Sequence, residues 1–87
     1  TPSVIWRVEL GRRAERELSE LPDAVLRRIV DKLRQLAEHP FPRGVKKLEG
    51  GGYRIRIGDY RVLYDVRSAD RTVVISAIGH RRDVYRH

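Results

Sequence analysis

The most constraining feature of this chain is a pair of short segments, 53–57 and 60–66, in which apolar or aromatic residues alternate with other residues. A period of two is typical of half-buried β-strands. Gly58 and Asp59 separate the two segments, and glycine at the first central position is what a two-residue type II′ hairpin turn requires. The sequence therefore predicts an antiparallel hairpin, and a loop of two residues determines which residues face each other across it.

The predicted register divides the side chains of this hairpin between two faces. Arg56 lies directly opposite Arg61, and Arg54 projects on the same side because residues two apart along a strand share a face. The opposite face carries apolar and aromatic side chains: Tyr53, Ile55, Ile57, Tyr60, Val62, Tyr64 and Val66. Like charges that face each other destabilise a sheet, by about 0.2–1 kcal/mol. Two interpretations of the arginines stay open, a surface for a polyanion and a solvated basic edge of the sheet.

The charge balance of the whole chain favours a polyanionic partner. The 87 residues include 19 lysines and arginines against 12 aspartates and glutamates, which gives a formal net charge of +7. Arginine predominates over lysine, and its planar fork suits bidentate contacts to phosphate. We therefore expect nucleic acid or a nucleic-acid machine as the partner, with an acidic protein or an anionic surface as the other options.

The composition also excludes several classes of site. The chain has no cysteine, so it cannot hold a disulfide framework, a thiolate metal site or a cysteine nucleophile. His39 has no partner at a spacing suited to metal binding, and no apolar run approaches the ~18–20 residues that a membrane span needs. We expect one domain, residues 1–87, that works in the cytoplasm without a membrane anchor, a metal or a small-molecule cofactor.

Helices are expected before the hairpin and a buried strand after it. Residues 4–10 have the composition of a strand, in which Trp6 is interpreted as a core or sheet-edge side chain rather than a platform for stacking a base. Apolar residues at helical spacing predict one helix over 12–21 and a second over 22–39, which ends before a proline. Residues 72–79 form a nearly continuous apolar run, which predicts an interior strand that is covered on both faces.

This order of elements predicts an α+β fold. We expect a small, mostly antiparallel sheet of four strands with two N-terminal helices on one face (β-α-α-β-β-β) and a short C-terminal tail or helical turn. The connection 41–52 contains Lys46 and Lys47, which add phosphate attraction, and a triple glycine. This glycine run lacks both the Lys-Ser/Thr ending and the following helix of a phosphate-binding loop, so we interpret it as a flexible entry to the hairpin.

Two stretches carry a resemblance to a known family. They are the hairpin motif Tyr60-Arg61-Val62-Leu63-Tyr64 and the ending Gly79-His80-Arg81-Arg82-Asp83-Val84-Tyr85-Arg86. Together with the predicted order of elements, they make the chain resemble the RelE/ParE superfamily of bacterial and archaeal toxins from toxin–antitoxin pairs, over essentially its whole length. The resemblance implies a type II toxin that is a metal-independent, ribosome-dependent endoribonuclease (an mRNA interferase). It also implies the ribosome, mRNA and a cognate antitoxin as partners.

The resemblance implies roles for individual residues in the attack of an RNA 2′-hydroxyl on the adjacent phosphate. Arg61 matches a hairpin arginine that clamps the phosphate. Arg81 matches a tail arginine that adds a second cation, and Tyr85 matches a tail tyrosine that stacks on or orients the base. Arg54 and Arg56 stand where well-studied RelE-like toxins carry lysines. The remaining expected RNA contacts are Lys46, Lys47 and Arg82.

With arginines at positions 54 and 56, the identity of the general base stays undetermined. A lysine can lose its proton when it is desolvated, whereas an arginine in a protein stays protonated. His80 is the candidate for the base, because a neutral imidazole titrates near physiological pH. The alternatives are electrostatic catalysis with no dedicated base and, for His80 itself, a purely structural contact at the end of a strand.

Two other functions compete with RNA cleavage. The ParE branch shares this fold and inhibits DNA gyrase, but its members generally lack the full set of basic residues with tyrosine, which favours the RelE-like branch. A non-catalytic nucleic-acid-binding module would bind through phosphates alone, with an affinity that falls steeply as salt increases. Cleavage of mRNA on the ribosome, inhibition of gyrase, and tight binding to naked nucleic acid without cleavage are the observations that separate the three.

Overall fold

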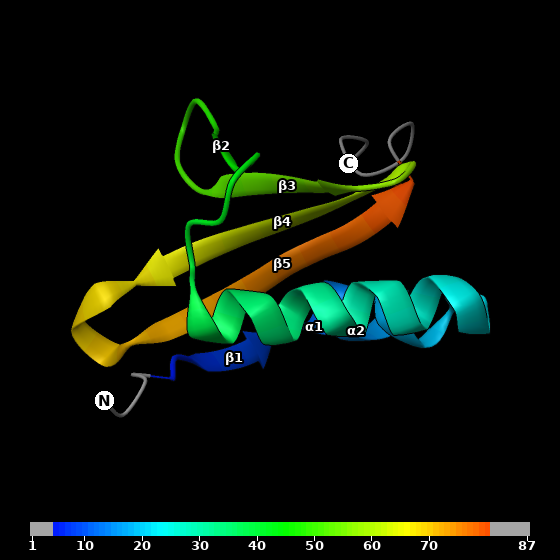
Figure 1. Ribbon diagram of the computed structural model, residues 1–87. Coiled ribbons are helices and arrows are strands. Elements are labelled where there is room, and N and C mark those ends of the chain that lie inside the picture. Colours follow the sequence, from blue (N-terminus) through cyan, green and yellow to red (C-terminus); the bar gives the residue numbers. More distant parts are fainter. Residues whose placement is uncertain (1–4, 81–87) are drawn as a thin grey trace.

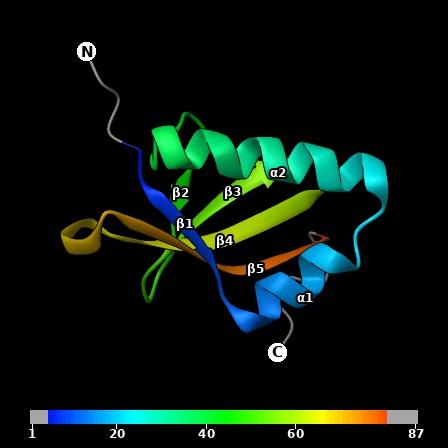
Figure 2. The same ribbon diagram turned by 90° about the horizontal axis from the view of Figure 1, so that it is seen from below.

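Residues 5–80 are described by the computed structural model of the chain. In chain order the elements are β1 (Arg7–Leu10), α1 (Arg12–Ser19), α2 (Asp23–Glu38), β2 (Lys46–Lys47), β3 (Tyr53–Ile57), β4 (Tyr60–Arg67), the 3-10 turn η1 (Ser68–Asp70) and β5 (Thr72–His80). The strands form one sheet in the order β1-β5-β4-β3-β2, and both helices lie on one of its faces (Figure 1, Figure 2). The expected C-terminal tail or helical turn, residues 81–87, lies outside the described residues.

The sheet differs from the prediction because it has five strands instead of four. The additional strand, β2, pairs antiparallel with β3 inside the segment predicted as a flexible connection. Positive φ angles at Gly50, Gly51 and Gly52 close a tight turn, in which the Leu48 N–H donates to the Gly52 carbonyl at 2.9 Å. This turn brings β2 alongside β3. A strand of two residues is too short to show a period of two, so the sequence pattern does not reveal it.

The sheet is also mixed, because β1 runs parallel to β5. Arg7 pairs with Thr72, and Leu10 pairs with Ile75. Strands β2 to β5 are joined by short connections and therefore alternate in direction, whereas the two helices carry the chain from β1 to the opposite edge of the sheet. A parallel pair needs a long crossover of this kind. The interior position predicted for the last strand is confirmed, since β5 lies between β1 and β4 and most of its residues are buried. The predicted cover on both faces is wrong for residues 5–80, because both helices lie on the same face.

The helices bury the apolar face of the sheet, as predicted. The core contains Ala14, Ile29, Leu33 and Leu36 from the helices and Ile55, Ile57, Val62, Tyr64, Val73, Ile75 and Ile78 from the strands. Apolar residues at helical spacing in α2 and at a period of two in the hairpin meet in this layer. The other face of the hairpin is left on the open side of the sheet.

The second helix begins and ends beside prolines. Pro22 precedes Asp23, and His39 adopts an extended conformation immediately before Pro40, because a residue before proline disfavours the helical region. The Pro40 carbonyl accepts a hydrogen bond of 2.8 Å from the hydroxyl of Tyr64, which ties the end of α2 to the centre of the sheet. In the chain from 5 to 80, neither helix is long and apolar enough to cross a bilayer.

The first helix is joined to the sheet by Glu17. One carboxylate oxygen accepts a hydrogen bond from the Ile78 backbone N–H at 2.9 Å, and the other lies 3.3 Å from Nε of Arg13. Because β1 pairs with β5 only as far as Ile75, Ile78 lies where β1 no longer covers the edge of β5. Glu17 therefore supplies the acceptor that a longer β1 would supply.

Glu17→Ala should lower the free energy of unfolding by about 1–3 kcal/mol, because the buried Ile78 N–H loses its acceptor. The matched control is Glu15→Ala, which removes an exposed carboxylate from the same helix and should change stability by less than about 0.5 kcal/mol. Urea denaturation of the two variants and the wild type measures both effects. Equal losses in the two variants would show that the contact to Ile78 contributes little.

Candidate nucleic-acid interface

At the hairpin end of the sheet, four cationic side chains share the face that the helices leave open. Arg56 pairs with Arg61 across the β3–β4 hairpin, and Arg54 lies two residues before Arg56. Lys46 of β2 pairs with Arg54, so its side chain projects on the same side. We call Lys46, Arg54, Arg56 and Arg61 the cationic face. The predicted opposition of the two arginines is confirmed, and the sheet adds a lysine from the unpredicted strand.

The β3–β4 turn holds two of these guanidiniums close to its backbone. Gly58 has a φ of 60°, and Arg71 is the only residue other than glycine between 5 and 80 with a positive φ. Asp59 therefore has the negative φ of the predicted type II′ turn. Nε of Arg56 donates to the Gly58 carbonyl at 3.2 Å, and Nη1 of Arg61 donates to the carbonyl of the preceding residue at 3.3 Å. Both guanidiniums are thus anchored near the turn.

Charges on the open face are compensated at one end of the sheet and not at the other. At the β1 end, Arg67 lies 3.1 Å from Glu9, and Arg7 lies 3.9 Å from the same carboxylate. At the hairpin end, the members of the cationic face other than Arg54 form no ion pair with an acidic side chain of residues 5–80. Uncompensated like charges raise the local positive potential, which favours the polyanion interpretation over the solvated edge.

Small and apolar residues lie beside these cations. Arg61 pairs with Gly79, and Leu63 pairs with Ala77 across β4 and β5. Leu63 also pairs with Arg54 on the other side. Because Gly79 has no side chain, nothing projects from β5 next to Arg61 at that position. A phosphate can approach the guanidinium from this side, and the half-buried Leu63 offers apolar surface to a base or a sugar.

Arg28 of α2 also reaches the hairpin, which the sequence pattern does not indicate. A Cβ placed on Gly58 would lie only 2.8 Å from Nη2 of Arg28, so the guanidinium packs directly on the glycine. Glycine at this position therefore serves both the positive φ of the turn and the close approach of the helix side chain. Helical periodicity assigns Arg28 to a solvated surface of the helix and carries no information about which turn lies next to it.

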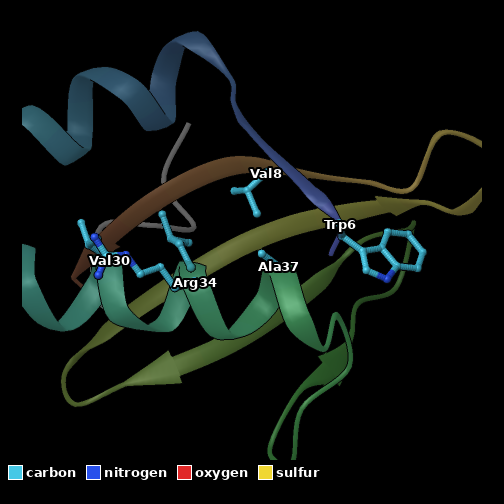
Figure 3. Close-up of a pocket in the computed structure, with 6 residues that line it drawn as sticks. Trp6, Val8, Val30, Arg34 and Ala37 are labelled. Carbon is cyan, nitrogen blue, oxygen red and sulfur yellow. The ribbon is translucent and has the colours of Figure 1, made fainter. Parts of the chain in front are cut away.

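Away from the cationic face, the described residues also form an apolar groove. This groove of about 210 Å³ lies between β1 and α2 (Figure 3); it is lined by Trp6, Val8, Val30, Leu33, Arg34 and Ala37. Trp6, the residue before β1, packs partly buried against the core and donates its backbone N–H to the Ala37 carbonyl at 2.6 Å, which agrees with the predicted packing role. Among residues 5–80, no three His, Cys, Asp or Glu side chains are grouped as metal ligands would be.

Comparison with known proteins places the chain in a family. Residues 8–85 match the ParE toxin of type II toxin–antitoxin system family, parDE. The chain is 32% identical over 87 residues to the putative toxin RelE1 of Methanocaldococcus jannaschii, covering 94% of this chain and 97% of that protein. The chain belongs to the RelE/ParE superfamily of toxins.

Solved structures place this toxin in the RelE-like branch. The archaeal RelE–RelB complex from Pyrococcus horikoshii OT3 has a TM-score of 0.81 at 35% identity, with coverage of 91% of this chain and 98% of that chain. The toxin–antitoxin complex RelBE2 from Mycobacterium tuberculosis has a TM-score of 0.80 at 32% identity, with coverage of 94% and 98%. The chain is therefore a RelE-like toxin of a type II toxin–antitoxin system, and the resemblance seen in the hairpin and the tail is confirmed.

In this RelE-like toxin, some of the predicted site residues lie together on one face of the sheet and others lie elsewhere. The cationic face unites the three hairpin arginines with one of the two lysines. His80 pairs with Tyr60 on the side that the helices cover, and the two rings lie 5.7 Å apart. Lys47 pairs with Tyr53 and projects to that same side. The tail residues Arg81, Arg82 and Tyr85 lie outside the described residues.

Proposed function

We propose that this toxin is a ribosome-dependent endoribonuclease that cleaves mRNA at the cationic face. The supporting observation is the directly opposed pair Arg56 and Arg61, which has no acidic partner among residues 5–80 and lies beside Gly79. In the reaction, the RNA 2′-oxygen forms a bond to phosphorus while the bond from phosphorus to the 5′-oxygen breaks. Negative charge grows on the other phosphate oxygens, and preorganised cations directed at such charge are usually the largest contribution to catalysis.

In this proposal the arginines stabilise charge and do not transfer protons. A guanidinium stays protonated throughout the physiological range. The 2′-hydroxyl proton must therefore pass to another group or to water, and the leaving 5′-oxygen must gain one. Because His80 pairs with Tyr60 on the helix-covered side, we favour electrostatic catalysis without a histidine base. Arg81 and Tyr85 retain the roles that the family resemblance implies, as a second cation and as a stacking group for the base.

His80→Ala should retain the cleavage rate and its pH profile, because an imidazole on the helix-covered side does not reach the 2′-hydroxyl. Single-turnover cleavage between pH 5 and 8, the range in which a histidine titrates, provides the measurement. A large loss of rate, together with a changed pH profile, would instead identify His80 as the general base.

The experiment that tests the proposed activity is a cleavage assay on programmed ribosomes, with the mRNA mapped by primer extension. Naked RNA of the same sequence is assayed beside it. A discrete cut in the decoding site, present only with ribosomes, would support the proposal. Cleavage of naked RNA alone would contradict the dependence on the ribosome, and the absence of a cut on every tested codon would contradict the nuclease itself.

Inhibition of DNA gyrase is the second candidate function. It is favoured by the family match, which carries the ParE name, whereas the individual relatives carry RelE names. A supercoiling assay with purified gyrase and an excess of the toxin separates the two. Full retention of supercoiling would exclude this candidate.

We also propose that a cognate antitoxin covers the cationic face with acidic side chains. The related proteins from Mycobacterium tuberculosis and Pyrococcus horikoshii are seen in toxin–antitoxin complexes, and complementary charge favours association and the correct register. Because salt screens exposed charges over a Debye length of about 8 Å at 0.15 M, the affinity should fall as salt increases. Calorimetric titration of the toxin with its antitoxin at low and high salt measures this. Equal affinities would show that charge complementarity does not drive the complex.

A further inference from the structure

We propose that Arg28 extends the RNA-binding surface around the β3–β4 turn. Phosphates of one RNA strand would then contact Arg56 on one side of the turn and Arg28 on the other. This inference rests on the proposed function, since it takes RNA as the ligand of the cationic face. It adds the first half of α2 to a surface that would otherwise end at the edge of the open face.

The contacts at the turn carry the inference. Nε of Arg56 donates to the Gly58 carbonyl at 3.2 Å. From the helix side, Nη2, Nη1 and Cζ of Arg28 lie 2.8, 3.4 and 3.5 Å from the position that a Cβ of Gly58 would occupy. Guanidiniums from a strand and from a helix therefore meet the same glycine, and no side chain at that position separates them.

Apart from its packing on Gly58, the Arg28 guanidinium has no polar partner in the described fold. Its side chain is exposed, and it forms no ion pair or hydrogen bond with another residue of the chain from 5 to 80. Asp59, the other residue of the turn loop, does not pair with it. A guanidinium carries five N–H donors, so packing against a glycine leaves donors for a ligand.

The chemistry of these groups favours the RNA backbone as the ligand. The planar fork of arginine matches the oxygens of a phosphate in bidentate geometry. Arg56 lies on the open face and Arg28 on the helix side of the hairpin turn. Cations on both sides of a turn suit a flexible single strand, because such a strand can bend around it. An acidic protein segment is the alternative, and the experiment below separates it from RNA.

The test compares Arg28→Ala with Arg27→Ala in the binding of a short oligouridine. Arg27 is the preceding residue of the same helix, but it lines a different surface with Leu26 and Asp31. On single strands, the logarithm of the binding constant falls with the logarithm of salt concentration by about 0.7 per phosphate contacted. Arg28→Ala should therefore reduce the slope by about 0.7 and weaken binding about fourfold at 0.15 M salt. Arg27→Ala should leave the slope unchanged.

Arg28→Lys and thermal unfolding separate a phosphate contact from a structural role. Arg28→Lys keeps the charge and should keep the slope, and the Tm of Arg28→Ala should equal that of the wild type. Equal changes of slope in the two alanine variants would overturn the proposal in favour of a general charge effect. A lower Tm with an unchanged slope would assign Arg28 to the stability of the turn. Weaker antitoxin binding with an unchanged slope would assign it to the protein interface.

The binding assay is independent of the proposed catalytic activity. If the chain binds oligouridine through Arg28 but does not cleave mRNA on ribosomes, this inference holds and the nuclease proposal fails. If the chain cleaves mRNA but Arg28→Ala binds oligouridine like the wild type, the nuclease proposal holds and this inference fails. Absence of any binding of oligouridine by the wild-type chain would also overturn the inference.

Discussion

Arg61→Ala should lower the single-turnover rate of mRNA cleavage on the ribosome by about 10²–10³, the usual loss when one preorganised donor to a developing oxyanion is removed. Arg61 faces Arg56 across the hairpin, and Nη1 is anchored to the Tyr60 carbonyl at 3.3 Å. The charge that it would stabilise grows only in the transition state, so kcat should carry the loss and KM should change less. Arg61→Lys keeps the charge without the planar fork, so its cleavage rate should lie between those of the wild type and Arg61→Ala.

Arg67→Ala is the matched control for this prediction. Arg67 lies on the same strand and the same face of the sheet, but it is paired with Glu9 at 3.1 Å at the β1 end. The control removes one positive charge from the open face without touching the cationic face, so the rate should stay close to that of the wild type. Equal losses in the two alanine variants would show that net charge alone matters and that Arg61 is not directed at the phosphate.

Tyr64→Phe should lower the free energy of unfolding at neutral pH by about 1–3 kcal/mol, because a buried acceptor loses its partner. Tyr64 is 1% exposed, and its hydroxyl donates to the carbonyl of the buried Pro40 at 2.8 Å. The substitution keeps the ring and its packing in the core. The matched control is Tyr53→Phe, because the half-buried Tyr53 ring lies 5.8 Å from that of Tyr64. Removal of its hydroxyl should change stability by less than about 0.5 kcal/mol.

The difference in the free energy of unfolding between the wild type and Tyr64→Phe should also depend on pH. Burial, with a smaller contribution from Tyr53, raises the pKa of Tyr64 to about 12, whereas an unfolded tyrosine titrates near 10. The stabilisation is complete below pH 10. As pH rises from 10 to 12 the unfolded state loses a proton that the folded state keeps, and stability falls by about 1.4 kcal/mol per pH unit.

Because Tyr64→Phe lacks this group, its stability should approach that of the wild type across the same window. Denaturant titrations of both proteins at a series of pH values give the measurement. A difference in the free energy of unfolding that stays constant between pH 10 and 12 would contradict the raised pKa of Tyr64 in the folded state.

The hairpin could be predicted closely because its determinants are local. A glycine that tolerates positive φ sets the turn at Gly58, and a loop of two residues then determines which arginine faces which. The alternation of side chains separates the arginines from the core within a few residues. For the same reason the limits of α2 could be predicted, since the prolines at positions 22 and 40 act on their immediate neighbours.

Other parts of the candidate site could not be predicted, because they depend on contacts between distant elements. Lys46 and Lys47 are neighbours in sequence and identical in kind, and only the pairing of β2 with β3 assigns the first to the cationic face. His80 ends a strand that the sequence does predict, but its pairing with Tyr60 decides on which side it lies. A period of two is uninformative when a strand is two residues long or when the question concerns its last residue.

The amino-acid sequence by itself determined the order of the main elements and the two faces of the hairpin, because turn chemistry and periodicity act over a few residues. The RelE/ParE superfamily was indicated separately, by the resemblance that the hairpin and tail motifs carry. Only the tertiary structure decided that β1 lies parallel to β5, that β2 forms a fifth strand at one edge of the sheet, and that Arg28 packs on Gly58. These are contacts between segments that the chain brings together from far apart. They arise when the apolar faces of the helices and the sheet are buried against each other.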